Sequence, residues 1–346
     1  MLIYWVLFAY FAVGSLFAPS GDVRTRSRPL LALGAVITAV LIGLRYRVGG
    51  DWDTYDYWFS YAGRGGLDRV LKFGDPAYQI LNWGAAHAGF EVWTVNLACG
   101  AIFAWGLWRF CKDQPEPWLG FAVAIPYMVI VIAMGYTRQA VALGILMAGL
   151  ASFRRNSSAL RFAMYVAIAA LFHKTAVVAF PLVALASPRN RVLNLLVVAA
   201  TSVLLYDIFL GDAMEQFVQH YIKTRYSSQG AAIRVAMTVV AAMVLWIGKR
   251  QFAFTETEWR LWRNFSFAAV AALVLLFVLP SSTAVDRISL YIIPLQLAVL
   301  SRVPLVTGSL MGGRVAVLAY SALVEFVWLN YAQFAKAWVP YQFYPF

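Results

Sequence analysis

Charge is scarce in this chain. Only 13% of its 346 residues are charged, whereas a soluble domain carries about 25%. This scarcity excludes a soluble enzyme with a fully hydrated surface, and the 62% of hydrophobic residues indicates a polytopic membrane protein. The net charge is +12, but most basic residues flank apolar runs. We therefore expect contact with membrane lipids and no nucleic-acid partner.

Groups that bind metals or cofactors are also scarce. The two cysteines, Cys99 and Cys111, fall on one predicted helix, too far apart along its axis to form a disulfide. His87, His173 and His220 lack the spacing of metal ligands, and no glycine-rich phosphate-binding loop is present. We expect no metal, no other cofactor and no ATPase subunit within the chain.

Long polar stretches are missing too, and no internal repeat or linker divides the chain. Apolar runs occupy most of it, and about 15 to 20 such residues can cross the ~30 Å of membrane hydrocarbon. The runs predict an all-α polytopic membrane protein, a single membrane domain over residues 1–346, with about 12 transmembrane helices (range about 10–14). The expected spans are residues 2–18, 30–44, 92–110, 118–135, 139–153, 161–172, 175–187, 192–210, 231–248, 264–280, 288–301 and 315–331.

The placement of basic residues in short loops predicts the topology, because such residues favour the cytoplasmic side. Both termini would then face the periplasm of a bacterial inner membrane, which the excess of arginine over lysine also favours. The expected periplasmic regions are residues 45–91 with an interfacial helix in 77–90, the loop 211–230 and the tail 332–346.

The first polar exception is the block 45–55, RYRVGGDWDTY, which follows an apolar run. Its two glycines permit a tight turn that presents Asp51 and Asp53 outside the membrane. These carboxylates could simply pair with Arg45 and Arg47. Alternatively, one of them deprotonates an acceptor hydroxyl while the arginines hold a diphosphate through two-armed contacts. The spacing leaves both interpretations open.

Two further polar residues interrupt apolar runs. Arg138 either snorkels from a short turn to the head groups or stands at the mouth of a cavity, where a helix start adds amide donors for a phosphate. We favour the second interpretation, because a turn needs no arginine. His173 is either a boundary residue or the general base that deprotonates a sugar hydroxyl. The adjacent Lys174 would keep its imidazole neutral.

Asp286 and Arg287 precede the expected span 288–301. They could pair with other helix ends. An arginine at a helix N-terminus opposes the helix dipole, however, so an anionic partner such as a phosphate would compensate. In the loop 211–230, Arg225 belongs either to a solvated surface or to a lid that clamps a lipid-linked sugar.

Four of these segments share an order and a spacing that cover most of the chain. They are RVGGDWDTY at 47–55, TRQAVA at 137–142, FHKTA at 172–176 and DRISLY at 286–291. Together they resemble the EpsG-like family of Wzy-type bacterial polysaccharide polymerases. The chain departs from that pattern at Gly50-Asp51, where a Gly-Thr-Asp run is more frequent, and at Lys174, where a small residue is frequent.

The resemblance implies a GT-C-like fold that acts at the periplasmic face on undecaprenyl-diphosphate-linked oligosaccharide. It also implies a flippase and a chain-length regulator as partners. A diphosphate leaving group is a weak base and needs charge stabilisation more than a proton, which arginines can provide. We therefore expect a polymerase that performs metal-independent, inverting glycosyl transfer.

In that reaction His173 is the first candidate for the general base, and Asp51 or Asp53 is the second. The expected diphosphate ligands are Arg138 and Arg287, with Arg45, Arg47 and Arg225 nearby. The expected substrate-binding residues are Tyr55, Tyr136, Gln139, Lys174, Asp286 and Tyr291. A glycan ligase with the same donor and a flippase or exporter of the lipid-linked sugar are the alternatives. The mechanism requires the four segments to converge on one periplasmic cavity.

Overall fold

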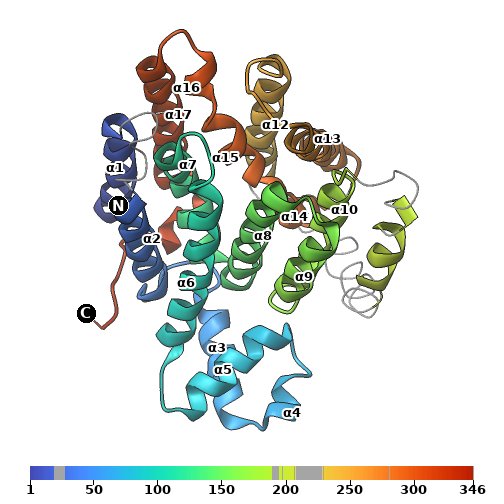
Figure 1. The fold of residues 1–346 in the computed structure, drawn as a ribbon. Coiled ribbons are helices and arrows are strands. Elements are labelled where there is room, and N and C mark those ends of the chain that lie inside the picture. Colours follow the sequence, from blue (N-terminus) through green and yellow to red (C-terminus); the bar gives the residue numbers. More distant parts are fainter. Residues whose placement is uncertain are drawn as a thin grey trace.

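The computed structural model describes residues 1–18, 28–188, 195–196, 198–205, 207, 228, 230–279 and 281–345. Every regular element within these residues is a helix, as expected, and the long helices pack into one bundle (Figure 1). The longer helices are α1 (Leu2–Phe17), α2 (Arg28–Gly43), α6 (Val92–Cys111), α8 (Thr137–Asn156), α9 (Ala159–Ala170), α12 (Ala231–Ile247), α13 (Glu256–Val278) and α17 (Leu310–Tyr331). The shorter elements are α7 (Pro117–Ala124), η2 (Ile125–Ala133), η3 (Lys174–Val178), α10 (Ala179–Ala184), α14 (Ser282–Ser289), η5 (Leu290–Ile292), α15 (Pro294–Leu300), α16 (Val303–Val306) and η6 (Gln333–Ala337).

Helix α8 runs through the centre of the bundle and is buried on nearly all sides. Close packing on α6 depends on two glycines, because a Cβ on Gly106 would lie 1.9 Å from the carbonyl oxygen of Gly144. Small residues at such crossings are typical of membrane helices, whose association depends on close van der Waals contact.

Two helices, α13 and α17, are long and apolar enough to cross a membrane on their own. A third candidate is the pair Ser282–Ile292 and Pro294–Val306, which is bent by 44°. Other expected spans form apolar helices of 10–17 residues, which at 1.5 Å per residue are shorter than the ~30 Å hydrocarbon layer. The described residues therefore support a membrane protein, whereas the twelve spans and the GT-C likeness stay predictions.

The bent pair corrects one boundary. We expected a span that begins at residue 288, but α14 begins at Ser282 and the chain bends before Pro294. Arg287 therefore lies in the last turn of α14, where a cation is favourable to the helix dipole. The dipole argument for a compensating phosphate at Arg287 was wrong.

The C-terminal segment 332–345 is not a projecting tail, because it packs back onto the bundle. The indole Nε1 of Trp338 donates to the Ile130 carbonyl oxygen in the π-helix η2 at 2.7 Å. The backbone N–H of Gly49 donates to the Ala337 oxygen at 2.9 Å. The Trp338 side chain is therefore buried between this segment and the bundle.

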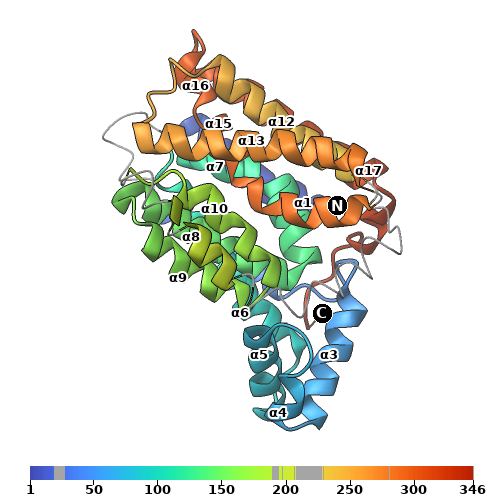
Figure 2. The same ribbon diagram turned by 90° about the vertical axis from the view of Figure 1, so that its right-hand side faces the viewer.

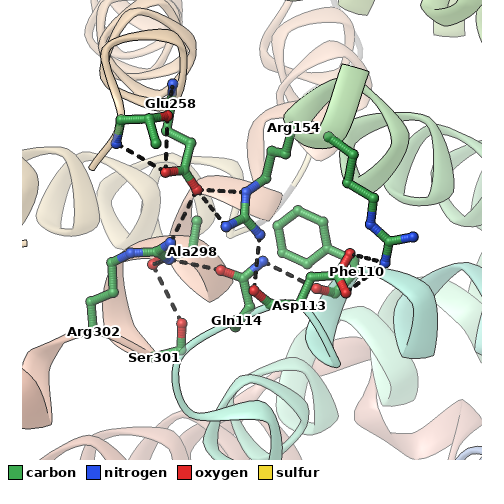
Figure 3. Close-up of polar contacts among 10 residues, drawn as sticks. Phe110, Asp113, Gln114, Arg154, Glu258, Ala298, Ser301 and Arg302 are labelled. Atoms are coloured by element: carbon green, nitrogen blue, oxygen red, sulfur yellow. Dashed lines mark hydrogen bonds and ion pairs between the residues drawn. The ribbon is translucent and has the colours of Figure 1, made fainter. Parts of the chain in front are cut away.

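Described loops and helix ends that carry basic residues, among them those that hold Arg154, Arg155 and Arg302, lie together at one end of the bundle, near α16. There Arg154 Nε donates to Glu258 Oε1 at 2.7 Å, and Arg302 Nη1 donates to Gln114 Oε1 at 2.7 Å (Figure 3). Arg155 pairs with Asp113 at 2.6 Å, and Arg314 pairs with Glu116 at 2.8 Å. The residues of this end, apart from Arg314 and Glu116, are called the α16-end network. They are Asp113, Gln114, Arg154, Arg155, Glu258 and Arg302.

The opposite end carries a projecting unit of three helices, α3 (Trp52–Arg64), α4 (Leu67–Val70) and α5 (Pro76–His87) (Figures 1 and 2). The sequence indicated only one of these helices, in the apolar stretch 77–90, which overlaps most of α5. Its placement in the membrane interface stays a prediction. The unit matters here because it delivers two segments of the candidate site.

Candidate functional site

The first site segment is held in place by a glycine. Gly49 has a φ of +109°, and a Cβ there would lie 2.2 Å from the carbonyl oxygen of Met134. Only glycine combines that backbone conformation with so close an approach. The contact seats the turn 49–51 directly against the chain that leads to Arg138, so Asp51 enters the site half-buried.

Arg45 supports this turn from inside. Its side chain is 1% exposed and donates through Nε to the Val48 oxygen at 3.2 Å, and through Nη2 to Thr137 Oγ1 at 2.8 Å. It also donates to the Ile42 carbonyl oxygen and to Asn96 Oδ1. The guanidinium is thus committed to backbone and neutral side chains. This corrects its predicted place beside the diphosphate, because no exposed edge remains to meet an anion.

Arg47 and Asp53 also differ from expectation. Both side chains are exposed. The Arg47 guanidinium lies over the Tyr46 ring, 5.4 Å from its centroid, and Asp53 sits in the first turn of α3. Within the described residues, neither of them forms a hydrogen bond or an ion pair with the segments at 136–139, 173–175 or 286–291.

The second segment begins α8 with Thr137, as predicted, and places Arg138 in the first turn. Arg138 Nη1 donates to Asp75 Oδ2 at 2.7 Å. The side chain of Arg138 is 36% exposed, whereas that of Asp75 is 7% exposed. The hydroxyl of Tyr55, a predicted site residue, interacts with the same guanidinium. Arg138 is therefore oriented by buried partners while part of it faces open space.

The third segment presents His173 between α9 and η3. Its Nδ1 lies 2.7 Å from Thr175 Oγ1 and 3.1 Å from the Tyr291 hydroxyl. Thr175 in turn donates to the Tyr291 hydroxyl at 3.3 Å. If the threonine proton is used there, its oxygen accepts from Nδ1–H, and the lone pair of the histidine is on Nε2. Nε2 makes no hydrogen bond within the described part of the chain.

The electrostatics of His173 keep it neutral. Burial lowers the pKa of the imidazole well below its ordinary value, and the positive charges of Arg138 and Arg287 lower it further. Lys174, which we expected to do this, is not among the causes. Its backbone N–H instead stabilises the Asp75 carboxylate. Because the imidazole stays unprotonated at neutral pH, it is available to accept a proton.

The fourth segment supplies Arg287. Its guanidinium lies over the Tyr136 ring, 4.7 Å from the centroid, and its backbone oxygen accepts from Gln139 Nε2 at 2.6 Å. Arg287 forms no ion pair within the described residues. The Gln139 side chain also interacts with the Tyr291 hydroxyl, so two predicted site residues link α8 to the fourth segment.

Asp286, in contrast, is already paired. It accepts from Arg234 Nε through Oδ1 at 2.7 Å and from Ser228 Oγ through Oδ2 at 2.8 Å. Its second oxygen also accepts from Arg234 Nη2. This corrects its predicted role as a substrate ligand, because the carboxylate joins α14 to α12 and is buried.

Asp51 completes the group at the mouth of this cluster. Burial raises the pKa of its carboxyl, and the charges of Arg287 and Arg138 oppose that rise. The same two arginines therefore act on both Asp51 and His173. We call the group Asp51, Tyr55, Asp75, Tyr136, Arg138, Gln139, His173, Thr175, Arg287 and Tyr291 the site cluster.

The family follows from a comparison over nearly the whole sequence. The sequence profile of the EpsG family matches residues 30–343. The chain belongs to the EpsG family. The resemblance predicted from four short segments is thereby confirmed, and membership relates the chain to Wzy-like polysaccharide polymerases. No curated protein sequence and no solved structure matches it significantly.

For this EpsG-family chain the four segments that carried the resemblance do meet. They come from the start of the projecting unit, from α8, from the turn after α9 and from the α14–η5 bend, and the Gln139–Arg287 and His173–Tyr291 contacts join three of them. Arg225, by contrast, lies outside the described residues. Among the described residues, no group of three or more His, Cys, Asp or Glu could hold a metal ion.

Sequence reasoning missed Asp75 and Thr175. A signal for Asp75 was present, because an aspartate before Pro76 at the start of an apolar helix is a typical N-cap pattern. Asp75 does occupy that position, but its side chain makes no capping bond and turns to Arg138. For Thr175, which lies within the FHKTA segment, the only signal in the sequence was its position two residues after His173.

Proposed function

We propose that the chain is a polysaccharide polymerase that joins undecaprenyl-diphosphate-linked oligosaccharide repeat units. The observation that supports this most directly is Arg287. Its guanidinium lies over the Tyr136 ring and forms no ion pair among the described residues. The neutral His173 and the partly exposed Arg138 are its neighbours. A cation that forms no direct ion pair in a partly buried site favours an anionic ligand.

In the proposed reaction Arg138 and Arg287 hold the diphosphate of the growing chain. A hydroxyl oxygen of the incoming unit attacks the anomeric carbon from the opposite face, and the bond from that carbon to the diphosphate oxygen breaks. The hydroxyl proton passes to His173 Nε2, and the bonding electrons leave with the diphosphate. The arginines stabilise the charge that develops on the leaving group, so no metal is needed for that task.

His173 is preferred to Asp51 as the base for a geometric reason. Nδ1 lies within hydrogen-bond distance of Thr175 Oγ1 and of the Tyr291 hydroxyl, and these contacts orient the ring, as catalytic histidines require. Asp51 lies beside the two arginines that would hold the diphosphate, where a second anion is repelled by the ligand. We assign Asp51 to orienting the acceptor, with Tyr55 and Tyr136 along the same wall.

The setting of the reaction follows from the same proposal. The α3–α5 end would face the periplasm, and a flippase would deliver the lipid-linked unit to it. A chain-length regulator would act on the product. Anionic donors approach this end, whereas the α16 end carries basic loops, as the cytoplasmic side of an inner-membrane protein does.

The test is incubation of the purified protein with a lipid-linked repeat unit in vesicles without a flippase. We expect a ladder of repeat units and release of undecaprenyl diphosphate. One capped acceptor would identify a ligase instead. Movement of the unit across the membrane without release of undecaprenyl diphosphate would identify a flippase or exporter.

The same assay examines the diphosphate ligand. Arg138→Lys should lower kcat about 10-fold or more, because a point charge cannot make the two-armed contact of a guanidinium. Unchanged turnover in Arg138→Lys would leave Arg138 with a structural role only. Arg47→Lys, at an exposed position on the same segment, is the matched control and should leave turnover unchanged.

A further inference from the structure

Asp75 lies between the two halves of the site cluster. Its carboxylate meets Arg138, which we assign to the diphosphate, and the backbone N–H of Lys174, which follows the proposed base His173. We propose that Asp75 is a positioning residue that sets Arg138 and His173 at their working separation. This inference rests on the proposed function and adds to it a residue that touches neither substrate.

The first support is that Asp75 does not perform the local task of its position. It stands at the N-cap of α5, yet its side chain accepts no bond from that helix. Burial raises the pKa of its carboxyl, and Arg138 and the Lys174 N–H oppose that rise. The carboxylate does not cap α5 and instead binds an arginine on another helix, 63 positions away. It therefore stabilises tertiary geometry rather than its own helix.

The second support is the difference between two ion pairs at this end. In the pair Arg234 and Asp286, two nitrogens bond two oxygens, and the side chains are 12% and 8% exposed. Asp75 takes only Nη1 of Arg138, whose side chain is 36% exposed. The first pair is closed. In the second pair the exposed part of the Arg138 guanidinium can still meet an anion, in an orientation that the Asp75 carboxylate sets.

The third support is a backbone link. The N–H of Ala77, in the first turn of α5, donates to the Leu171 oxygen at the end of α9 at 3.0 Å. Together with the Lys174 N–H, this ties the start of α5 to both sides of His173. A movement of Asp75 would therefore shift the histidine turn and Arg138 together.

A double-mutant cycle tests this. Asp75→Asn should lower kcat about 10-fold or more with a smaller change in KM, because the misplaced groups act mainly in the transition state. In Asp75→Asn/Arg138→Lys the loss should stay within about 3-fold of Arg138→Lys alone, since residues that act through one another are not additive. Losses that multiply would overturn the proposal.

Asp286→Asn is the matched control, because it removes a buried carboxylate at the same end without touching Arg138. Its losses should multiply with those of Arg138→Lys. If Asp75→Asn does not fold, Asp75→Glu serves in its place, because it keeps the charge and lengthens the arm. It should lower kcat with the same non-additivity, and full activity of Asp75→Glu would contradict a positioning role.

A binding measurement separates this inference from the proposed function. Farnesyl diphosphate, a short polyprenyl diphosphate, is titrated against the same variants without turnover. Non-additive weakening by Asp75→Asn and Arg138→Lys would support the positioning role even if the wild-type protein forms no polymer. Additive weakening, or none from Asp75→Asn, would overturn it while leaving an observed polymerase activity intact.

Discussion

The two polar clusters at opposite ends of the bundle differ in how completely they are paired. In the α16-end network, Glu258 lies between Arg154 and Arg302, and Gln114 accepts from Arg302 at 2.7 Å (Figure 3). Each charged group there has an opposite charge within contact. In the site cluster, Arg287 forms no ion pair within the described residues, and Arg138 pairs with a carboxylate through one nitrogen only.

This difference indicates a structural role for the α16-end network and a ligand-binding role for the site cluster. A paired and buried network gains little from a ligand, and it ties α8, α13, α15 and the 112–116 turn into one end. An open cluster leaves Arg287 without a direct ion pair and part of Arg138 exposed, and it can exist only because the surrounding bundle holds it. The comparison predicts opposite mutational behaviour at the two ends.

The largest expected effect is on catalysis at the open end. His173→Ala should lower kcat by about 10²–10⁴-fold, the usual contribution of a general base, while the melting temperature changes little. The polymerisation assay and thermal unfolding in detergent measure the two quantities. His87→Ala is the control and should be fully active, because His87 is on the projecting unit, where its ring lies 4.4 Å from that of Trp83. Full polymerisation by His173→Ala would remove the base assignment.

The reverse behaviour is expected at the closed end. Glu258→Gln keeps the capping box with Thr255 but leaves Arg302 and Arg154 without their shared carboxylate. Breaking such a buried pair should destabilise the protein by about 3 kcal/mol, with kcat preserved in the folded fraction.

Glu256→Gln is the matched control for that variant. Glu256 pairs with Arg260 on the same helix, but its side chain is 77% exposed, so the expected loss is about 0.5 kcal/mol or less. Equal melting temperatures for the two glutamine variants would contradict the prediction that the buried α16-end network stabilises the protein.

A smaller effect is expected from the glycine that seats the first segment. Gly49→Ala should cost about 1–3 kcal/mol, because alanine is strained at a φ of +109° and its Cβ would meet the Met134 oxygen. Activity should fall as well, since the strain lies beside Asp51. Gly84→Ala on α5 has no heavy atom within 4 Å and should be neutral or slightly stabilising. Equal effects of the two substitutions would contradict the seating contact.

The sequence predicted what depends on local pattern. Apolar runs placed α6 and α8 to within a few residues, because helix formation in such runs needs no distant partner. Arg138 at a helix start and His173 at a helix boundary also followed from their neighbours. Family membership agreed with four short segments because their order along the chain is itself sequence information.

What failed depends on distant contacts. Arg45 is adjacent in sequence to Arg47, but only the folded chain shows that Thr137 and Asn96 receive its N–H groups. For Asp286 the sequence left pairing with another helix end open, but it could not identify Arg234 as the partner, because Arg234 lies 52 positions away. The C-terminal segment was predicted to be a tail. The contact that holds it to the bundle is a hydrogen bond from the Trp338 indole to a backbone oxygen, and a backbone acceptor cannot be recognised from the residue types in the sequence. Such pairings are fixed by tertiary packing and leave no local pattern.

The finest test of the open cluster is the pH dependence of kcat/KM. Because burial and the charges of Arg138 and Arg287 lower the pKa of His173, the neutral base persists at acidic pH and the acid limb should lie well below pH ~6.5. Arg287→Gln removes one positive charge, so the pKa of His173 should rise and the limb should move to higher pH. Arg287→Lys keeps the charge and should leave the limb in place.

Asp51 could produce the same upward shift, because Arg287 also lowers the pKa of its carboxyl. The two bases are separated by repeating the Arg287→Gln profile in an Asp51→Asn background. If His173 accepts the proton, the shift persists there, because the arginine still acts on the imidazole. If the shift disappears with Asp51, that aspartate is the base, and the histidine contributes to the open cluster only by orientation.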